Sequence, residues 1–180
     1  MVTKTILIQT KNLILRKITI EDAQPMYKNW ASDDDVTKYL NWQTHRNINV
    51  TKDIIMTWIH QYNNDFFFQW IIEHIQNKEV IGTISLFNYR DNSLEVGYCI
   101  SKKYWNQGLT TEACSAVLDF AFNKIGVDKV YARHVRENEA SGRVMQKNNM
   151  TFINTTIEYI AAKNKRVYMN HYIIKKEDFK

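Results

Sequence analysis

Anion chemistry is indicated by one segment, YWNQGLTTEA, which begins at Tyr104. It holds a glycine, Gly108, followed by Leu109 and by the hydroxyls of Thr110 and Thr111. Apolar residues then recur at helical spacing, so the pattern predicts a helix that begins near Leu109. The first turn of a helix has unpaired N–H groups and a partial positive charge, which together attract anions. The segment therefore predicts a phosphate site.

Backbone amides would do most of the binding there. No Lys or Arg occurs between Trp105 and Asn123, so a phosphate would rest on the N–H groups of Gln107 to Thr111 without a cationic side chain. Gly108 lets the backbone turn sharply and a ligand approach closely. An ordinary helix start, capped by one of the threonines, is the alternative. A Walker loop needs Gly-Lys-Ser/Thr and a dinucleotide fingerprint needs three spaced glycines. Neither is present, which disfavours nucleotide hydrolysis and Rossmann-type redox chemistry.

The histidines and cysteines predict neither a metal site nor a covalent mechanism. Metal-ligand spacing is lacking among the histidines, which are His45, His60, His74, His134 and His171. Cys99 and Cys114 form no C-x-x-C pair and have no local His partner. A Gly-x-Ser-x-Gly elbow is also missing. We expect no metal, and we interpret Cys99 as a small apolar filler rather than a nucleophile.

Composition predicts one folded domain over residues 1–180. The 21.4 kDa chain is 44% apolar and has 8 Phe, 10 Tyr and 5 Trp, enough for a core, which excludes a disordered chain. Five glycines and one proline are too dispersed to mark a linker. The length suits a single domain.

Charge and hydropathy indicate which classes of partner and which cellular location to expect. The chain has 24 basic and 19 acidic residues, hence +5, and the basic residues are scattered. Nucleic-acid binding needs clustered basic residues with interleaved aromatics, so we expect none. The longest apolar stretch, FFFQWII from Phe66, is too short to cross a bilayer, and the N-terminus lacks a signal-peptide pattern. We therefore expect a cytoplasmic protein without membrane association, either a monomer or a homodimer.

The elements that must position these residues alternate between strands and helices. Strands are predicted at 13–18, 66–75, 79–89, 93–101, 128–135, 151–162 and 166–175, and helices from Thr19 and at 49–62, 109–125 and 139–148. The order β-αα-βββ-α-β-α-ββ indicates an α/β (α+β) fold with helices on a mixed sheet. The helix at 49–62 is predicted because Val50, Ile54, Ile55 and Trp58 recur at helical spacing.

Short motifs along nearly the whole chain resemble one family. They are LEVGYCI from Leu94, YWNQGLTTEA from Tyr104, LILR from Leu13, EDA from Glu21, YLNW from Tyr39, IGTI from Ile81 and NEASGRVM from Asn138. Their sequence and order are similar to those of the GCN5-related N-acetyltransferases (GNAT), most closely the branch that acetylates N-terminal alanine or serine of ribosomal proteins.

This resemblance implies a mostly antiparallel sheet, splayed at its centre and flanked by helices. It also implies acetyl-CoA as co-substrate, with the pyrophosphate on the Gln107–Thr111 turn and pantetheine along the strand ending at Ile100. Two positions depart from the family. Thr110 stands where Gly or Ala is usual, and Asn148-Asn149-Met150 replaces Leu-Gly-Phe. Asn tolerates the left-handed conformation, so Asn149 can still end the helix.

Acetyl transfer to an amine needs a neutral amine and a polarised thioester carbonyl. An α-amine has a pKa of about 7.7–8.0 and needs less help than a Lys amine near 10.4. Glu95 is the candidate base, because it lies two residues before Gly97 and shares its strand face. An exposed Glu, or one paired across the sheet, is the alternative. A backbone N–H near Cys99 or Ile100 would polarise the carbonyl.

The leaving thiolate needs a partner on the helix that follows Asn138. Many relatives carry a Tyr acid where this chain has Met145, which cannot donate a proton. Ser141 lies one helical turn after Asn138. The resemblance implies that Ser141 hydrogen-bonds the thiol and that Asn138 contacts pantetheine, although Asn138 can also simply cap the helix.

The acceptor site is the least defined by sequence. By analogy with the branch, Tyr39 and Trp42 line it, although plain packing explains them equally well, and His45 is expected at the surface. Asp33-Asp34-Asp35 is expected to be a solvated turn that caps the next helix. We expect a protein or peptide N-terminal α-amine as acceptor. The alternatives are a small amine (polyamine, amino acid or aminoglycoside), or a non-catalytic acyl-CoA-binding module, which Met145 favours.

Overall fold

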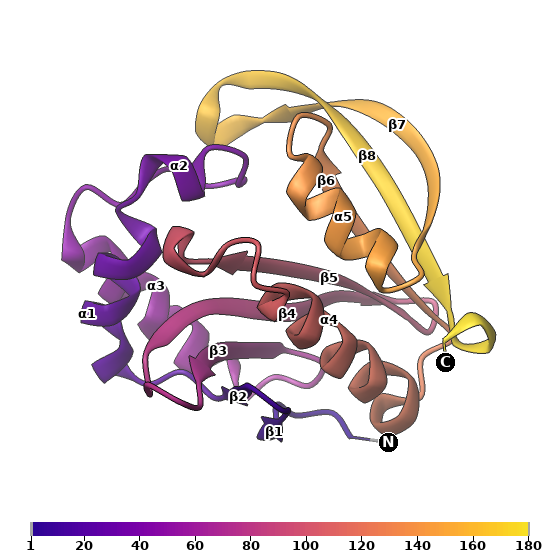
Figure 1. The fold of residues 1–180 in the computed structure, drawn as a ribbon, viewed down its shortest axis with the longest axis horizontal. Coiled ribbons are helices and arrows are strands. Elements are labelled where there is room, and N and C mark those ends of the chain that lie inside the picture. Colours follow the sequence, from indigo (N-terminus) through magenta and orange to yellow (C-terminus); the bar gives the residue numbers. More distant parts are fainter. Residues whose placement is uncertain (1, 180) are drawn as a thin grey trace.

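The computed structural model describes residues 2–179. Its strands form one sheet in the order β1-β2-β3-β4-β5-β6-β8-β7, with helices on both sides (Figure 1). The strands are β1 Ile8–Gln9, β2 Leu13–Arg16, β3 Phe68–His74, β4 Val80–Arg90, β5 Ser93–Ile100, β6 Lys129–Val135, β7 Thr151–Ile160 and β8 Lys165–Lys175. The helices are α1 Ala23–Met26, α2 Asp34–Thr37, α3 Ile48–Gln61, α4 Leu109–Phe120 and α5 Glu139–Lys147.

The sheet is splayed between β5 and β6. Between the named strands of the described residues, all pairs are antiparallel except this one, in which Ser93–Val96 of β5 lie beside Lys129–Ala132 of β6. Pairing then stops, while β5 runs on to Ile100. Figure 1 shows the two strands diverging from their paired ends. We call this point, just beyond Val96, the fork. The predicted mostly antiparallel, centrally splayed sheet is confirmed.

The N-terminal third differs most from the predicted elements. A two-residue strand, β1, was missed, because it is too short to show a period. The helix predicted from Thr19 is instead a 3-10 turn, the short helix α1 and a π-type turn that ends at Ala31. Thr19 does begin it, with a capping box to Asp22.

The predicted helix at 49–62 is present as α3, and its buried face combines an apolar and a polar residue. Val50 is 44% exposed and Ile54 36% exposed, whereas Thr51 and Ile55 are fully buried. The Thr51 hydroxyl lies 2.8 Å from Nδ1 of His45, so its polar group is satisfied inside. The buried face of α3 therefore includes a polar residue whose partner lies on the preceding segment.

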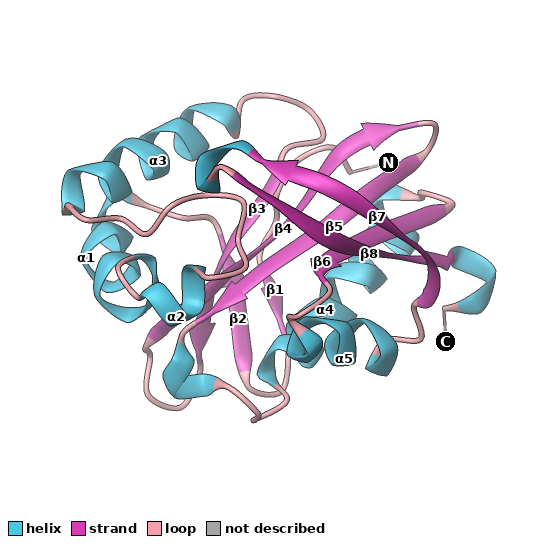
Figure 2. Ribbon diagram, turned by 90° about the horizontal axis from the view of Figure 1, so that it is seen from above, coloured by secondary structure: helices cyan, strands magenta, loops and turns pink. Residues whose placement is uncertain are grey.

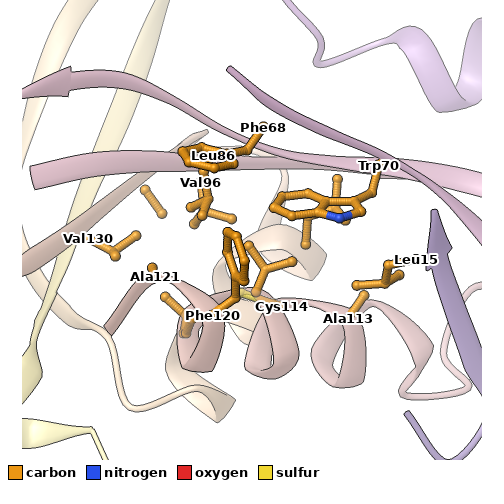
Figure 3. Packing of buried hydrophobic residues seen from close by; sticks show 14 of the residues in the cluster. Leu15, Phe68, Trp70, Leu86, Val96, Ala113, Cys114, Phe120, Ala121 and Val130 are labelled. Atoms are coloured by element: carbon orange, nitrogen blue, oxygen red, sulfur yellow. The ribbon is translucent and has the colours of Figure 1, made fainter. Parts of the chain in front are cut away.

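The main core fixes α4 against the sheet. Phe120 meets Phe68 and Trp70 edge-to-face, with ring centroids 5.4 Å apart in both pairs (Figure 3). Val117 and Ala113, one and two turns earlier, are also fully buried. This contact along the helix holds the N-terminus of α4 beside the end of β5, where the phosphate site was predicted.

The helices fall into two groups on opposite sides of the sheet (Figure 2). α4 and α5 pack on the face that carries Val96 and Tyr98, whereas α1 and α3 cover the opposite face around Ile71 and Cys99. Side chains alternate along a strand, so Glu95 and Gly97 share the face of Cys99. Among the described residues, none of the helices has the length and apolar character needed to cross a membrane.

Candidate active site

A cavity of about 550 Å³ opens where β5, α4, α5 and α2 meet. It brings together many of the residues that the sequence predicted. The predicted residues that line it are Tyr39, Cys99, Ile100, Gly108, Thr110, Thr111, Asn138 and Ser141. Four predicted residues, Trp42, Glu95, Gln107 and Leu109, are not part of its lining.

The turn before α4 offers its main-chain amides. Gly108 has φ +77°, a left-handed conformation that favours glycine, and Asn106 has φ +60°. Within residues 2–179, the N–H groups from Gln107 to Thr111 donate to no protein acceptor. The Gln107 side chain donates to the Lys103 carbonyl at 2.9 Å, and Leu109 is buried in the core. These two residues therefore present only their N–H groups, as an anion site at a helix N-terminus requires.

An acidic residue in the first turn of α4 is held outside the cavity. Glu112 accepts hydrogen bonds from both nitrogens of Asn12, each at 2.8 Å, and it does not line the cavity. The Glu112 carboxylate is thus hydrogen-bonded to the turn between β1 and β2. The carboxylate stabilises the helix start without standing where an anion would bind.

Two cationic side chains reach the same cavity from α5. Arg143 and Lys147 lie one turn apart and line it. The expectation of a site without cations is therefore wrong, because these residues come from an element 30 or more positions away. Asn148 secures the contact by donating to the Thr111 carbonyl at 3.3 Å. Asn149, with φ +58°, ends the helix as predicted.

Strand β5 presents two N–H groups to the fork. Cys99 pairs with Thr83 of β4, and the Ser101 N–H donates to the Ile81 carbonyl at 2.7 Å. Hydrogen bonds alternate along an antiparallel pair, so the Cys99 N–H points to β4. The N–H groups of Tyr98 and Ile100 point the other way, where β6 has departed. Ile100 rather than Cys99 is therefore available to a ligand carbonyl.

The Cys99 thiol is not disposed for nucleophilic chemistry. Burial raises the pKa of Cys99 to about 12, so the thiol stays protonated at neutral pH. It packs with the apolar cluster beneath α1 and α3, in agreement with its interpretation as an apolar filler.

Asn138 and Ser141 lie at the start of α5. The Asn138 side-chain oxygen accepts from the Ser141 N–H at 3.4 Å, which caps the helix. Its amide nitrogen can still donate to a ligand. The Ser141 hydroxyl donates to Tyr98 Oη at 3.2 Å, and Tyr98 Oη donates to the Ser141 carbonyl at 3.0 Å. Sequence reasoning missed Tyr98, although strand alternation from Gly97 directs it to the face that carries α5.

Glu95 lies on the opposite face of β5, in a second cavity of about 720 Å³. Its two carboxylate oxygens accept from Arg133 Nε at 2.9 Å and from Asn88 Nδ2 at 3.0 Å. Arg133 also donates to Glu158 at 2.7 Å. Pairing across the sheet, the alternative considered for Glu95, is thus what the geometry displays. Each oxygen keeps a second lone pair, so a base role stays a prediction.

Of the two residues predicted to line the acceptor site, Tyr39 lines the first cavity and Trp42 does not. Tyr39 lines the first cavity and also packs against the small cluster around Val135 and Met169. Trp42 instead contacts the His45 ring, with centroids 4.9 Å apart. His45 is 6% exposed, so its expected surface position is wrong, and burial lowers its pKa.

The acidic run Asp33-Asp34-Asp35 lies at the start of α2, and one of its residues lines the first cavity. Asp33 caps α2 as predicted, accepting from the Asp35 N–H at 2.8 Å. Asp35 lines the first cavity and is paired with Lys102. Nowhere in residues 2–179 do three or more His, Cys, Asp or Glu side chains gather as metal ligands would.

Comparisons with known proteins define the class. Residues 12–151 match the family model of the acetyltransferase (GNAT) domain. The N-acetyltransferase YoaA of Bacillus subtilis strain 168 is 32% identical over 143 residues, which cover 78% of this chain and 80% of YoaA. The chain therefore belongs to the GNAT family and is an N-acetyltransferase that uses acetyl-CoA.

Solved structures agree on the fold. A GNAT-family acetyltransferase from Bacillus anthracis superposes with a TM-score of 0.84 at 24% identity, covering 96% of this chain and 99% of the other. RimL, the ribosomal L7/L12 alpha-N-protein acetyltransferase, was solved in complex with coenzyme A. It gives a TM-score of 0.82 at 16% identity, covering 94% of this chain and 98% of RimL.

Proposed function

We propose that the protein acetylates the N-terminal α-amine of a protein or peptide. The observation that carries this proposal is the environment of Glu95, the candidate base. Glu95 and Glu158 share Arg133 between them, so Arg133 compensates one of the two negative charges and leaves a single one on the acceptor face. A polyamine or aminoglycoside carries several positive charges and would favour unpaired carboxylates. An α-amine carries one charge and, with a pKa of about 7.7–8.0, needs only a weak base.

The size of the second cavity also supports a peptide. At about 720 Å³ it extends over β4 to β8 on the face of Glu95. A single small amine would fill only part of this volume, whereas the residues that follow a peptide N-terminus can occupy the rest. Tyr131 and Ile153 in its lining offer apolar contacts.

Main-chain amides make the principal contacts with the pyrophosphate of acetyl-CoA. The amides of Gln107 to Thr111 receive the pyrophosphate, helped by the hydroxyls of Thr110 and Thr111. Arg143 and Lys147 add positive charge from α5. The Asn138 amide and the exposed edge of β5 then hold the pantetheine arm between the turn and the fork. Acetyl-CoA supplies the activated thioester.

The chemical step would take place beside Tyr98, where the fork closes. The N–H groups of Tyr98 and Ile100 polarise the carbonyl, because they point into the space that β6 leaves. Glu95 lies three residues from Tyr98, about 10 Å along the strand, and takes the amine proton through a chain of more than one water molecule. The new N–C bond forms as the C–S bond breaks, and the sulfur leaves with the bonding electron pair. Ser141 donates a hydrogen bond to that sulfur.

A thiol-release assay with four acceptor classes tests this proposal. We expect peptides with a free N-terminus to release CoA thiol, and the same peptides with a blocked N-terminus and an internal lysine not to do so. Turnover with a polyamine, amino acid or aminoglycoside but with no peptide would overturn it. Acetyl-CoA binding without turnover of any of the four classes would also overturn it.

We also propose a cytoplasmic location, where thiols such as Cys99 and Cys114 stay reduced. Whether the protein acts as a monomer or a homodimer can be measured by light scattering.

A further inference from the structure

A phenol reaches the start of α5 from strand β5. Tyr98 Oη donates to the Ser141 carbonyl and accepts from the Ser141 hydroxyl, at 3.0 Å and 3.2 Å. Both residues line the first cavity. Met145, where many relatives carry a Tyr, is 1% exposed and lies in the core. The helix therefore supplies no phenol of its own here, whereas the strand beside the fork does.

We propose that Tyr98 is a positioning residue, which holds the Ser141 hydroxyl so that this hydroxyl donates a hydrogen bond to the departing sulfur of coenzyme A. The inference rests on the role of Ser141 proposed above and extends it to a second residue. It does not depend on which amine is the acceptor.

The hydroxyl pair can change partners without leaving a polar group unpaired. Before a thiolate is present, the Ser141 hydrogen points to Tyr98 and the Tyr98 hydrogen points to the Ser141 carbonyl. When sulfur develops negative charge, the Ser141 hydrogen turns to it. The Tyr98 hydrogen can then turn to Ser141 Oγ, because the carbonyl keeps the helical hydrogen bond from Met145. A donor that itself receives a hydrogen bond is a stronger donor.

Tyr98 keeps its own proton throughout. Burial raises the pKa of Tyr98 well above its usual value near 10, whereas a thiol titrates near 8.5. The phenol therefore does not protonate the sulfur. The sulfur keeps the electron pair of the broken C–S bond, leaves as a hydrogen-bonded thiolate and takes a proton from water after release. The proton lost by the amine leaves separately through Glu95.

The test is the thiol pKa of coenzyme A bound to the protein, followed through the ultraviolet absorbance of the thiolate. We expect Tyr98→Phe to raise this pKa by about one unit and Ser141→Ala by about two, relative to the wild type. In turnover, Tyr98→Phe should lower kcat about tenfold while the Kd for acetyl-CoA stays unchanged. A thiol pKa that is the same in Tyr98→Phe and the wild type would overturn the proposal.

Tyr62→Phe is the matched control. The Tyr62 hydroxyl also makes two hydrogen bonds, from the Ile18 N–H at 3.0 Å and to the Gln69 carbonyl at 2.8 Å, but it lies outside the cavity. Its loss should lower Tm as Tyr98→Phe does and leave the thiol pKa unchanged. An equal change of thiol pKa in Tyr62→Phe would reduce the Tyr98 effect to general destabilisation and contradict the proposal.

Ser141→Thr provides a second check, because it keeps a hydroxyl at the same position. We expect its bound thiol pKa to stay within a few tenths of the wild-type value, and a shift as large as that of Ser141→Ala would count against the proposal. Since none of these titrations contains an amine, a wrong acceptor in the proposed function leaves their outcome untouched.

Discussion

The proposed phosphate end and the proposed acceptor end of this protein differ in the groups they use, which are main-chain amides in the first and side chains in the second. At the phosphate end, the N–H groups of Gln107 to Thr111 donate to no acceptor among residues 2–179, and one glycine sets the turn. At the acceptor end, Glu95 lies among side chains from several strands and is already paired with Arg133 and Asn88. The first site is made by a local helix start, whereas the second depends on how distant strands are paired.

The difference has a consequence for robustness. A main-chain site tolerates many side chains, provided that the turn forms and no negative charge enters it. A network of side chains fails when one member is removed, because its partners are left unpaired. We therefore expect conservative substitutions to be costly at the acceptor end and, unless they add charge, mild at the phosphate end.

The largest effect should come from Glu95→Gln. If Glu95 accepts the amine proton, kcat/KM falls by about 10²-fold or more, and the loss is smaller at high pH, where the amine is already neutral. Steady-state kinetics over a pH series measures this. Glu158→Gln is the control, because Glu158 shares Arg133 with Glu95. Equal losses in both variants would indicate that the ion-pair network, and not a base, was removed.

A charge at the phosphate end should have the next largest effect. Thr110→Glu places a carboxylate in the first turn of α4, where it stabilises the helix but repels the pyrophosphate. We expect the Kd for acetyl-CoA to rise about 100-fold while Tm stays the same or increases. Thr110→Gln, of similar size without charge, should change Kd by less than about fivefold. Calorimetry provides both numbers, and a lowered Tm with unchanged Kd would contradict the assignment.

The smallest effect is expected at the two cations of α5. Arg143→Gln and Lys147→Gln should each weaken acetyl-CoA binding about three- to tenfold, because both side chains are exposed and screened by solvent. Titrations at low and high salt should show that the difference in acetyl-CoA affinity between the wild type and each variant shrinks as ionic strength rises. An effect that does not change with salt would mean that these side chains act by shape and not by charge.

The same contrast explains what the sequence could predict. The element order from α3 onward, the splayed sheet and the turn at Gly108 follow from local patterns together with the family resemblance. Arg143 and Lys147 were missed because only the packing of α5 against α4 brings them to the turn. The pairing of Glu95 with Arg133 was open because it depends on the register of β5 against β6.

Buried polar residues account for the remaining errors. His45 was expected at the surface and Thr51 was not expected to be buried, yet they satisfy each other inside. Neither residue type signals burial by itself, because the partner lies on a different segment. Tyr98 was overlooked for the same reason, since its hydroxyl becomes informative only when Ser141 is brought next to it.

The central claim is that the amides of the turn before α4 hold the pyrophosphate, and amide NMR tests it most directly. Coenzyme A should shift the N–H resonances of Gln107 to Thr111 more than any others. Pantetheine alone, which lacks the phosphates of the nucleotide end, should move those of Tyr98 and Ile100 but leave the turn unchanged. If coenzyme A binds and the five turn amides keep their free-protein positions, the account is contradicted.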